Sequence, residues 1–442
     1  MESRLNVLFI GIDTLRADHL GCYGYVRRTS PNIDRLASRG VLFSNAFAPA
    51  IPTDPGWTTL FTGVHPLRHC IVSHAGDVVL SEDIPLLSQV LKKHDYVTVA
   101  VDNLHRWFER GYDYYLDPGY EEAPSGGRKV TADRVNSRAV EWLRGWASRR
   151  RGDERFFMFV HYWDPHTPYV PPSPYDRMFY KGDERDPRNP TMRKVREISP
   201  IWFLFERWLR GITDVEYVVA QYDGEIAYVD SKVGELLEVL DELGLVEETL
   251  VVLTSDHGEL MIEHDIYFDH HGLYDPNVRV PLAMSCPGIL PHGVVVDAFV
   301  QHVDVAPTIL GLLGLGHEWM DGMDLMEVLY GGREGYREVY LFENTWMCKR
   351  AIRTRKWKLI KTVKERDLYG RPVGWLELYD LERDPYETTN LAASEVDVAR
   401  SLERQLEAWV RRALGDRPDP QLSQRTSLRS RFLEKLRQCG RV

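Results

Sequence analysis

The segment Val7–Thr14 reads VLFIGIDT, an uninterrupted apolar run that ends in an aspartate and a threonine. A run of this kind is typical of a strand buried on both faces of a parallel sheet, because such a strand has no side that faces water. Asp13 then lies at the carboxyl end of a strand, where open α/β sheets build their sites. This stretch alone leaves two readings open for Asp13, a ligand at a site or a cap of the next segment.

Further apolar runs alternate with helical patterns along the first three quarters of the chain. The predicted strands are residues 41–47, 96–101, 155–160 and 250–255, and the predicted helices are residues 31–37, 84–93, 130–149 and 213–243. Such alternation favours a mostly parallel sheet with helices on both faces. The sequence therefore predicts an α/β fold.

The pattern changes after Gly331. Shorter alternating strands are predicted at residues 338–342, 351–353, 356–360 and 376–381, followed by a helix at residues 396–414. We expect a main domain over residues 1–335, a small α+β domain over residues 336–415 and a basic tail over residues 416–442.

An insertion rich in proline, arginine and aspartate interrupts the main domain at about residues 170–211. Its aromatic segment Ile201–Phe205 is expected to pack against other residues, because a large apolar patch is rarely exposed to water. The segment either packs on its own domain or forms a substrate lid or a subunit contact.

Polar side chains follow several of the predicted strands. They are Asp13, then Asn103 with His105, then His161, Asp164 and His166, and finally Asp256 with His257. Because parallel strands end at one edge of a sheet, these groups are expected to converge there. Asp13, Asp256 and His257 offer the oxygen and imidazole ligands that suit a divalent cation.

The segment Pro49–Gly63, PAIPTDPGWTTLFTG, reads as a loop that enters a helix. Thr53 falls at the helix N-terminus, where free N–H groups and the helix dipole favour an anion. The residue is either a helix cap or a nucleophile. A cation bound beside Thr53 would lower the pKa of its hydroxyl and polarise an ester oxygen, so Thr53 is also a candidate fourth metal ligand.

The net charge of −11 argues against general affinity for nucleic acid. The five cysteines are scattered and odd in number, which favours free thiols in a reducing compartment. No window reaches 18 apolar residues and no secretory leader is evident, so we expect a cytoplasmic protein without a membrane span. The expected partner is a small anionic ester, and a homo-oligomer stays an open alternative.

Eight motifs in this order resemble the sulfatase family of the alkaline phosphatase superfamily over nearly the whole chain. They are Asp13–Gly24, Thr29–Leu36, Leu60–Gly63, Asp164–Tyr169, Ser255–Glu259, Val278–Leu282, Asp304–Thr308 and Leu378–Leu391. The resemblance implies an alkaline phosphatase-like α/β/α sandwich with a small C-terminal subdomain.

The resemblance also implies roles for individual residues. It implies that Asp13, Asp256 and His257 bind the metal and that His166 binds the substrate anion. His105 matches the histidine of the family's Lys-x-His pair. His270 or His271 falls beside the leaving group, and the sequence does not separate the two.

The chain departs from the family pattern at the nucleophile. Sulfatases carry Cys-x-Pro-x-Arg, or serine in place of the cysteine, and oxidise the first residue to formylglycine. Here the aligned segment is Thr53–Trp57, so the first residue cannot become the aldehyde and Trp57 replaces the arginine. Asn103 replaces the lysine of the Lys-x-His pair. Threonine is the nucleophile of superfamily relatives that act on phosphodiesters or transfer phosphoglycerol.

These features predict a metal-dependent hydrolase of phosphate mono- or diesters that forms a phosphothreonine on Thr53. His270 or His271 would aid the leaving group, and His166, His105 and Asn103 would bind the substrate. The alternatives are a sulfatase that works without formylglycine and a non-catalytic relative that binds anions. One divalent ion, Mn, Zn, Mg or Ca, is expected. A second site at Asp164, His166 and His271 is the less favoured reading.

Overall fold

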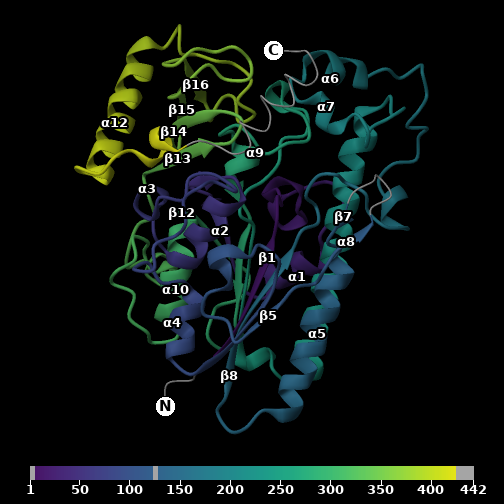
Figure 1. The fold of residues 1–442 in the computed structure, drawn as a ribbon, viewed down its shortest axis with the longest axis vertical. Helices are drawn as coiled ribbons and strands as arrows, with labels where there is room; N and C mark the ends of the chain where they lie inside the picture. Colours follow the sequence, from purple (N-terminus) through teal and green to yellow (C-terminus); the bar gives the residue numbers. More distant parts are fainter. Residues whose placement is uncertain (1–4, 123–127, 425–442) are drawn as a thin grey trace. The chain divides into compact units, whose positions relative to one another are not determined.

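The computed structural model describes residues 5–122 and 128–424 (Figure 1). The described chain divides into two compact units that interleave in sequence. The first contains the segments up to Ser44, Ser88–Asp269 and Pro281–Val296, and the second contains Asn45–Leu87, His270–Val280 and the chain from Asp297 onward. From residue 425 on, the predicted basic tail lies outside the described residues. The domain boundaries at residues 335 and 415 stay predictions.

The larger sheet is mostly parallel around its central strand β1. Its strands run in the order β10 (Arg279–Val280), β2 (Val41–Phe47), β11 (Leu282–Ser285), β9 (Thr249–Thr254), β1 (Asn6–Ile12), β8 (Arg155–Tyr162), β4 (Tyr96–Val101) and β5 (Tyr114–Leu116), with β12 (Val294–Gln301) against β2. Strand β1 pairs in parallel with β8 and β9, and β4 with β8 and β5. All seven residues of β1 are buried, as its apolar run predicts.

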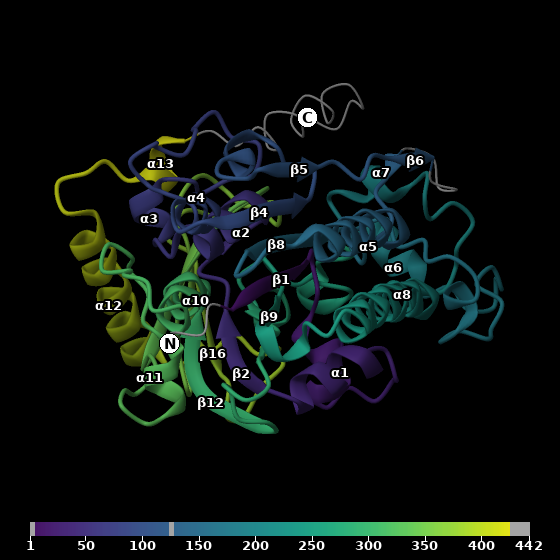
Figure 2. The same ribbon diagram turned by 90° about the horizontal axis from the view of Figure 1, so that it is seen from below.

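The helices of the first unit outside the insertion are α1 (Pro31–Ser38), α4 (Leu87–Lys93), α5 (Ala132–Arg149) and α8 (Val215–Glu242). Helix α5 packs on α8 and on strand β8 (Figure 2). Helix α1 packs on α8 and β11. Helix α5 buries Val135, Ala139 and Leu143, which recur at helical spacing on one side. A short ladder joins β6 (Glu121–Glu122) to β7 (Arg128–Lys129).

The insertion contributes α6 (Met192–Ile198) and α7 (Trp202–Phe205) to the first unit. Ile201, Trp202 and Phe205 are buried. The centre of the Phe205 ring lies 6.2 Å from the centre of the Phe268 ring, and the centre of the Trp208 ring lies 6.1 Å from that same point. The aromatic segment therefore packs on its own unit, which was the first of the two alternatives.

The second unit is built on a mixed sheet in the order β16 (Leu376–Asp380), β15 (Trp357–Thr362), β14 (Cys348–Thr354), β13 (Glu338–Asn344) and β3 (Ala50–Ile51). Its pairs are antiparallel except β13 with β3. Its helices are α2 (Thr53–Thr62), α3 (Pro66–His69), α9 (Asp275–Val278), α10 (Val305–Leu312), α11 (Leu325–Leu329), α12 (Val396–Leu414) and α13 (Pro420–Ser423). Helix α12 covers β14 and β15 with Leu402, Leu406 and Val410.

The predicted α/β class is thus confirmed, with a mostly parallel nine-stranded sheet and a second, smaller mixed sheet among the described residues. The strands and the helix predicted after Gly331 are confirmed as β13 to β16 and α12. No helix in the described ranges is both long and apolar enough to cross a membrane.

Candidate active site

Three predicted metal ligands meet at the carboxyl ends of two neighbouring strands. Asp13 follows β1, and Asp256 and His257 follow β9, which pairs with β1 in parallel. One ligand atom from each residue lies within 4.8 Å of the others, and all three residues are completely buried. The sheet register therefore builds the cluster that the strand-end argument predicts.

The donor set fits a divalent cation. Both carboxylate oxygens of Asp13 and Oδ2 of Asp256 are buried and accept no hydrogen bond from the described residues. A buried carboxylate without donors is costly, and a hard cation is the group that such oxygens bind. The His257 Nδ1 atom lies 2.8 Å from the Gly258 carbonyl oxygen, so Nδ1 carries the hydrogen and Nε2 the lone pair. Nε2 lies 3.3 Å from Asp256 Oδ2, on the side of the cluster.

Backbone donors hold the other oxygen of Asp256. Its Oδ1 accepts the N–H groups of His257 at 2.9 Å and of Thr14 at 3.3 Å. Thr14 has φ 54°, a left-handed conformation that β-branched residues rarely adopt. This strained residue directly follows Asp13, and strain of this kind clusters at functional sites.

The two carboxylates have opposite electrostatic surroundings. Burial raises the pKa of Asp256, and the nearby charge of Asp13 raises it further. Burial would also raise the pKa of Asp13, but the neighbouring His161, His166 and His257 outweigh it and lower that pKa. The cluster therefore carries competing negative charge, which a bound cation would neutralise.

His161 is a functional candidate that sequence reasoning placed among the strand-end polar groups but did not assign to the site. It lies in β8, completely buried, with Nε2 at 3.6 Å from Asp13 Oδ2 and Nδ1 at 2.8 Å from Asp102 Oδ1. Burial would lower its pKa, but Asp102 and Asp13 outweigh burial and raise it to about 9. The signal in the sequence was its place directly after the predicted strand 155–160. The structure pairs β8 with β1 and puts His161 opposite Gly11, two residues before Asp13.

Asp164 is engaged by one cationic and one backbone donor. Its Oδ1 pairs with Lys129 Nζ at 2.6 Å, and its Oδ2 accepts the Ala132 N–H at 2.8 Å. The same Lys129 ammonium pairs with the buried Glu225. Since both oxygens of Asp164 already have donors, the carboxylate anchors the start of α5. The second metal site at Asp164, His166 and His271 stays a prediction, and the single-metal interpretation stays the favoured one.

The predicted substrate-binding residues differ in exposure. His166 is partly buried, and its Nδ1 lies 2.7 Å from the Thr167 carbonyl oxygen. Asn103 is buried and accepts a hydrogen bond from Trp163 Nε1 at 2.6 Å. His105 is 47% exposed and pairs with Glu109 at 2.7 Å. The charge of His166 is one of the causes that lower the pKa of Asp13. The substrate roles of His166, Asn103 and His105 stay predictions.

Thr53 is the first residue of α2 and is 4% exposed. The N-cap position belongs to Pro52, so Thr53 does not serve as the helix cap. The next residue, Asp54, pairs with His74 at 3.0 Å and accepts the Ala75 N–H at 2.9 Å. Thr53 belongs to the second unit and the metal ligands to the first, so the structure describes these two parts of the predicted site separately.

His270 and His271 have different surroundings in the second unit. His271 is completely buried, and its Nε2 lies 3.3 Å from the Tyr369 hydroxyl. His270 is partly buried, and its carbonyl oxygen accepts a hydrogen bond from the Asn277 amide. Sequence reasoning missed Tyr369, since nothing near it in the chain marks it as a partner of a histidine.

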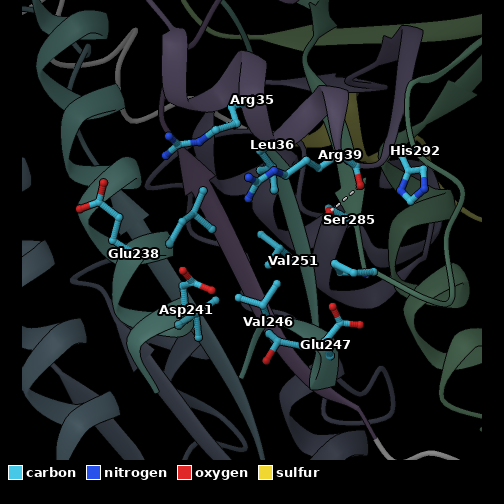
Figure 3. Close-up of a pocket in the computed structure, with 14 residues that line it drawn as sticks. Arg35, Leu36, Arg39, Glu238, Asp241, Val246, Glu247, Val251, Ser285 and His292 are labelled. Carbon is cyan, nitrogen blue, oxygen red and sulfur yellow. Dashed lines mark hydrogen bonds between the residues drawn. The ribbon is translucent and has the colours of Figure 1, made fainter. Parts of the chain in front are cut away.

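A cavity of about 620 Å³ lies at the other end of the first unit's sheet (Figure 3). Arg39, Asp241, Val251 and His292 line it, with Thr249, the first residue of β9. Asp256 follows the opposite end of β9, and six residues of strand span about 20 Å. The cavity is therefore remote from the metal ligands and contains no predicted site residue.

A mostly parallel α/β sheet with a buried cation-ligand cluster at its strand ends defines a metal-binding α/β protein. The sequence profile described as Sulfatase matches residues 5–315, and that described as N-sulphoglucosamine sulphohydrolase, C-terminal, matches residues 263–412. The chain therefore belongs to the sulfatase family, within the alkaline phosphatase superfamily, and is a hydrolase of ester bonds. Enzymes of this family bind a divalent metal.

Three similar proteins illustrate the range of the family. An arylsulfatase of Clostridium perfringens is 24% identical over 451 residues, covering 88% of this chain and 90% of the relative. The multifunctional alkaline phosphatase superfamily protein PehA of Trinickia caryophylli is 26% identical, covering 71% of this chain and 74% of the relative. The phosphonate monoester hydrolase of Agrobacterium radiobacter superposes with a TM-score of 0.74 at 23% identity, covering 93% and 96% of the two chains. The last similarity supports the fold.

Proposed function

We propose that the protein hydrolyses phosphate mono- or diesters through a covalent phosphothreonine on Thr53. The observation that carries the proposal is the residue itself: a buried threonine begins α2 at the position where sulfatases carry the formylglycine precursor. A threonine hydroxyl can attack phosphorus but cannot become the aldehyde of a sulfatase. The similarity to PehA and to a phosphonate monoester hydrolase supports phosphorus as the atom attacked.

Asp13, Asp256 and His257 would hold one divalent ion. When bound, the ion supplies Lewis-acid stabilisation of negative charge on the ester and on the attacking oxygen. The hydrogen bond between His257 Nδ1 and the Gly258 carbonyl fixes the ring so that Nε2 can serve as the ligand. His161, whose Nε2 lies 3.6 Å from Asp13 Oδ2, would fix the orientation of that carboxylate.

The remaining steps belong to side chains of this protein. The Thr53 hydroxyl gives its proton to water and its oxygen forms the bond to phosphorus. The bond from phosphorus to the alcohol breaks, and a histidine, His270 or His271, gives a proton to the departing alcohol oxygen. Water then attacks phosphorus, the neutral histidine takes the proton of that water, and the phosphorus–Thr53 bond breaks to release the phosphate product. The N-terminus of α2 adds N–H groups and a favourable dipole where charge builds up on the phosphoryl oxygens.

Sulfuric ester hydrolysis without formylglycine is the second candidate. It is favoured by the arylsulfatase relative and by the family profile. It predicts that an aryl sulfate is turned over faster than the matching aryl phosphates. A third outcome, binding of anions without turnover, would follow if the histidines and Thr53 served recognition alone.

The test compares aryl phosphate, bis-aryl phosphate and aryl sulfate with purified protein in Mn²⁺, Zn²⁺, Mg²⁺ or Ca²⁺. We expect metal-dependent cleavage of a phosphate ester, and a loss of about a thousandfold or more in kcat for Thr53→Ala. Thr62→Ala, at the far end of the same helix, is the matched control and retains turnover. Full activity in Thr53→Ala would overturn the nucleophile, and faster sulfate cleavage would favour the second candidate.

A further inference from the structure

The loop between β15 and β16 carries Tyr369 to His271, although 98 residues separate the two in the chain. The Tyr369 hydroxyl lies 3.3 Å from His271 Nε2. The two rings are stacked at an angle of 29° with their centres 6.3 Å apart. Both residues belong to the second unit, as does Thr53.

The backbone next to His271 is fixed by a buried carboxylate and an amide. Glu343 Oε1 accepts the Gly272 N–H at 2.9 Å and the Thr345 hydroxyl at 2.6 Å. The Asn277 amide donates to the carbonyl oxygens of His270 at 2.9 Å and Gly272 at 2.8 Å. The carbonyl before His271 and both polar groups of Gly272 after it are thus held, so the direction of the His271 side chain is constrained.

The Asp367 carboxylate fixes the backbone of the loop that carries Tyr369. Its Oδ1 accepts the N–H groups of Tyr369 and Arg371, each at 2.9 Å. Its Oδ2 pairs with the buried Lys349 ammonium at 3.2 Å. Because a carboxylate that accepts two backbone donors closes a tight turn, the position of the Tyr369 ring is set by the fold of the loop.

One buried carboxylate, Glu377 in β16, connects the loop to the segment of His271. It accepts hydrogen bonds from Tyr274 at 2.6 Å and from Arg371 at 2.6 Å, and it pairs with Lys349 at 3.0 Å. Tyr274 lies three residues after His271, and Arg371 lies two residues after Tyr369. Glu377 therefore fixes both chain segments relative to each other.

The same network lies beside the chain that leads into Thr53. Strand β3 pairs in parallel with β13, which places Ile51 opposite Glu343. Thr53 follows two residues after Ile51, and the Gly272 N–H contacts the Glu343 carboxylate. Thr53 and His271 are thus attached to one strand pair of the second unit.

We infer that Tyr369 is a positioning residue that holds His271, rather than His270, as the proton donor to the leaving alcohol. The inference rests on the proposed function. In the step it serves, the Thr53 hydroxyl gives its proton to water, its oxygen bonds to phosphorus, and the phosphorus–oxygen bond to the alcohol breaks. The His271 imidazolium gives its Nδ1 proton to the departing oxygen and becomes neutral, while Nε2 keeps its hydrogen bond to Tyr369. Tyr369 keeps the ring in place through its hydrogen bond to Nε2.

The test compares two phosphate esters that differ only in the leaving group, 4-nitrophenyl and phenyl. A departing 4-nitrophenolate needs little help from an acid, whereas phenolate needs more. In His271→Asn the kcat/KM for the phenyl ester should fall at least about tenfold further than that for the nitrophenyl ester. Tyr369→Phe should change the same ratio by about fivefold, the size expected from one lost hydrogen bond.

Two comparisons separate positioning from a general effect on the fold. In the His271→Asn background, Tyr369→Phe should leave the leaving-group ratio unchanged, because its only route to the reaction is gone. Tyr340→Phe, a matched tyrosine variant in β13 of the same unit, should not change the ratio. The inference is overturned if His271→Asn lowers kcat/KM equally for both esters. It is also overturned if the leaving-group ratio changes in His270→Asn and not in His271→Asn.

A measurement without substrate keeps this result distinct from the proposed function. The ¹⁵N chemical shifts of the His271 ring, assigned with His271→Asn, should move in Tyr369→Phe because the Nε2 hydrogen bond is lost. Unmoved shifts overturn the positioning role, whatever the reaction is. Inactivity of the wild type on both esters overturns the proposed function, while moved shifts would still support the contact.

Discussion

Replacement of Glu377 by glutamine should destabilise the protein in a way that depends on pH. The Glu377 carboxylate is 2% exposed and accepts from Lys349, Arg371 and Tyr274. Burial by itself would raise its pKa, but Lys349 and Arg371, helped by the Tyr274 hydroxyl, outweigh burial and lower it to about 2. Glu377→Gln keeps the shape of the side chain and removes the charge.

The size of the effect follows from that pKa. A carboxyl that titrates near 2 when folded and near 4.5 when unfolded contributes about 3 kcal/mol of stability at neutral pH. Since the folded pKa is lowered, the contribution is complete above the unfolded pKa and is lost as pH falls from about 4.5 toward 2. At pH 3.5 it should have decreased to about 2 kcal/mol.

Urea denaturation of the wild type and of Glu377→Gln at pH 7 and pH 3.5 measures this difference. Glu382→Gln is the control, because Glu382 is an exposed partner of Lys356 at 3.7 Å and surface pairs contribute little. The difference between the wild type and Glu377→Gln should be about 3 kcal/mol at pH 7 and smaller at pH 3.5. An equal difference at both pH values would show that the charge of Glu377 is not the source of the stability.

Two further outcomes test the metal site and the insertion. Asp13→Asn should abolish the stabilisation that a divalent ion gives the wild type, about 3 kcal/mol when the ion is at 100 times its dissociation constant. Thermal melts with the ion and with EDTA measure it, and a wild type that melts identically in both would contradict the site. Phe205→Ala should cost about 3 kcal/mol, because Phe205 is buried against Phe268 and Trp208. A loss below about 1 kcal/mol in urea denaturation would show that the insertion is not part of the core.

The fold could be predicted from local pattern because the strands of this sheet have local signatures. Strand β1 is apolar from Val7 to Ile12, and the strands after Gly331 alternate as half-covered strands do. The metal cluster could also be predicted, since Asp13 and Asp256 each follow a strand end and parallel strands bring such ends together. The helix at Thr53 was predicted as well, although its cap is Pro52.

The sequence by itself determined the α/β class, the family and the three metal-ligand candidates, because each of these depends on residue types at short spacing. Tertiary structure decided which donors surround each group. Lys129 and the N-terminus of α5 engage Asp164, and His161 lies 3.6 Å from Asp13. Tyr369 reaches His271 across 98 residues. No local periodicity encodes such contacts, since each depends on where two distant segments meet after the chain has folded.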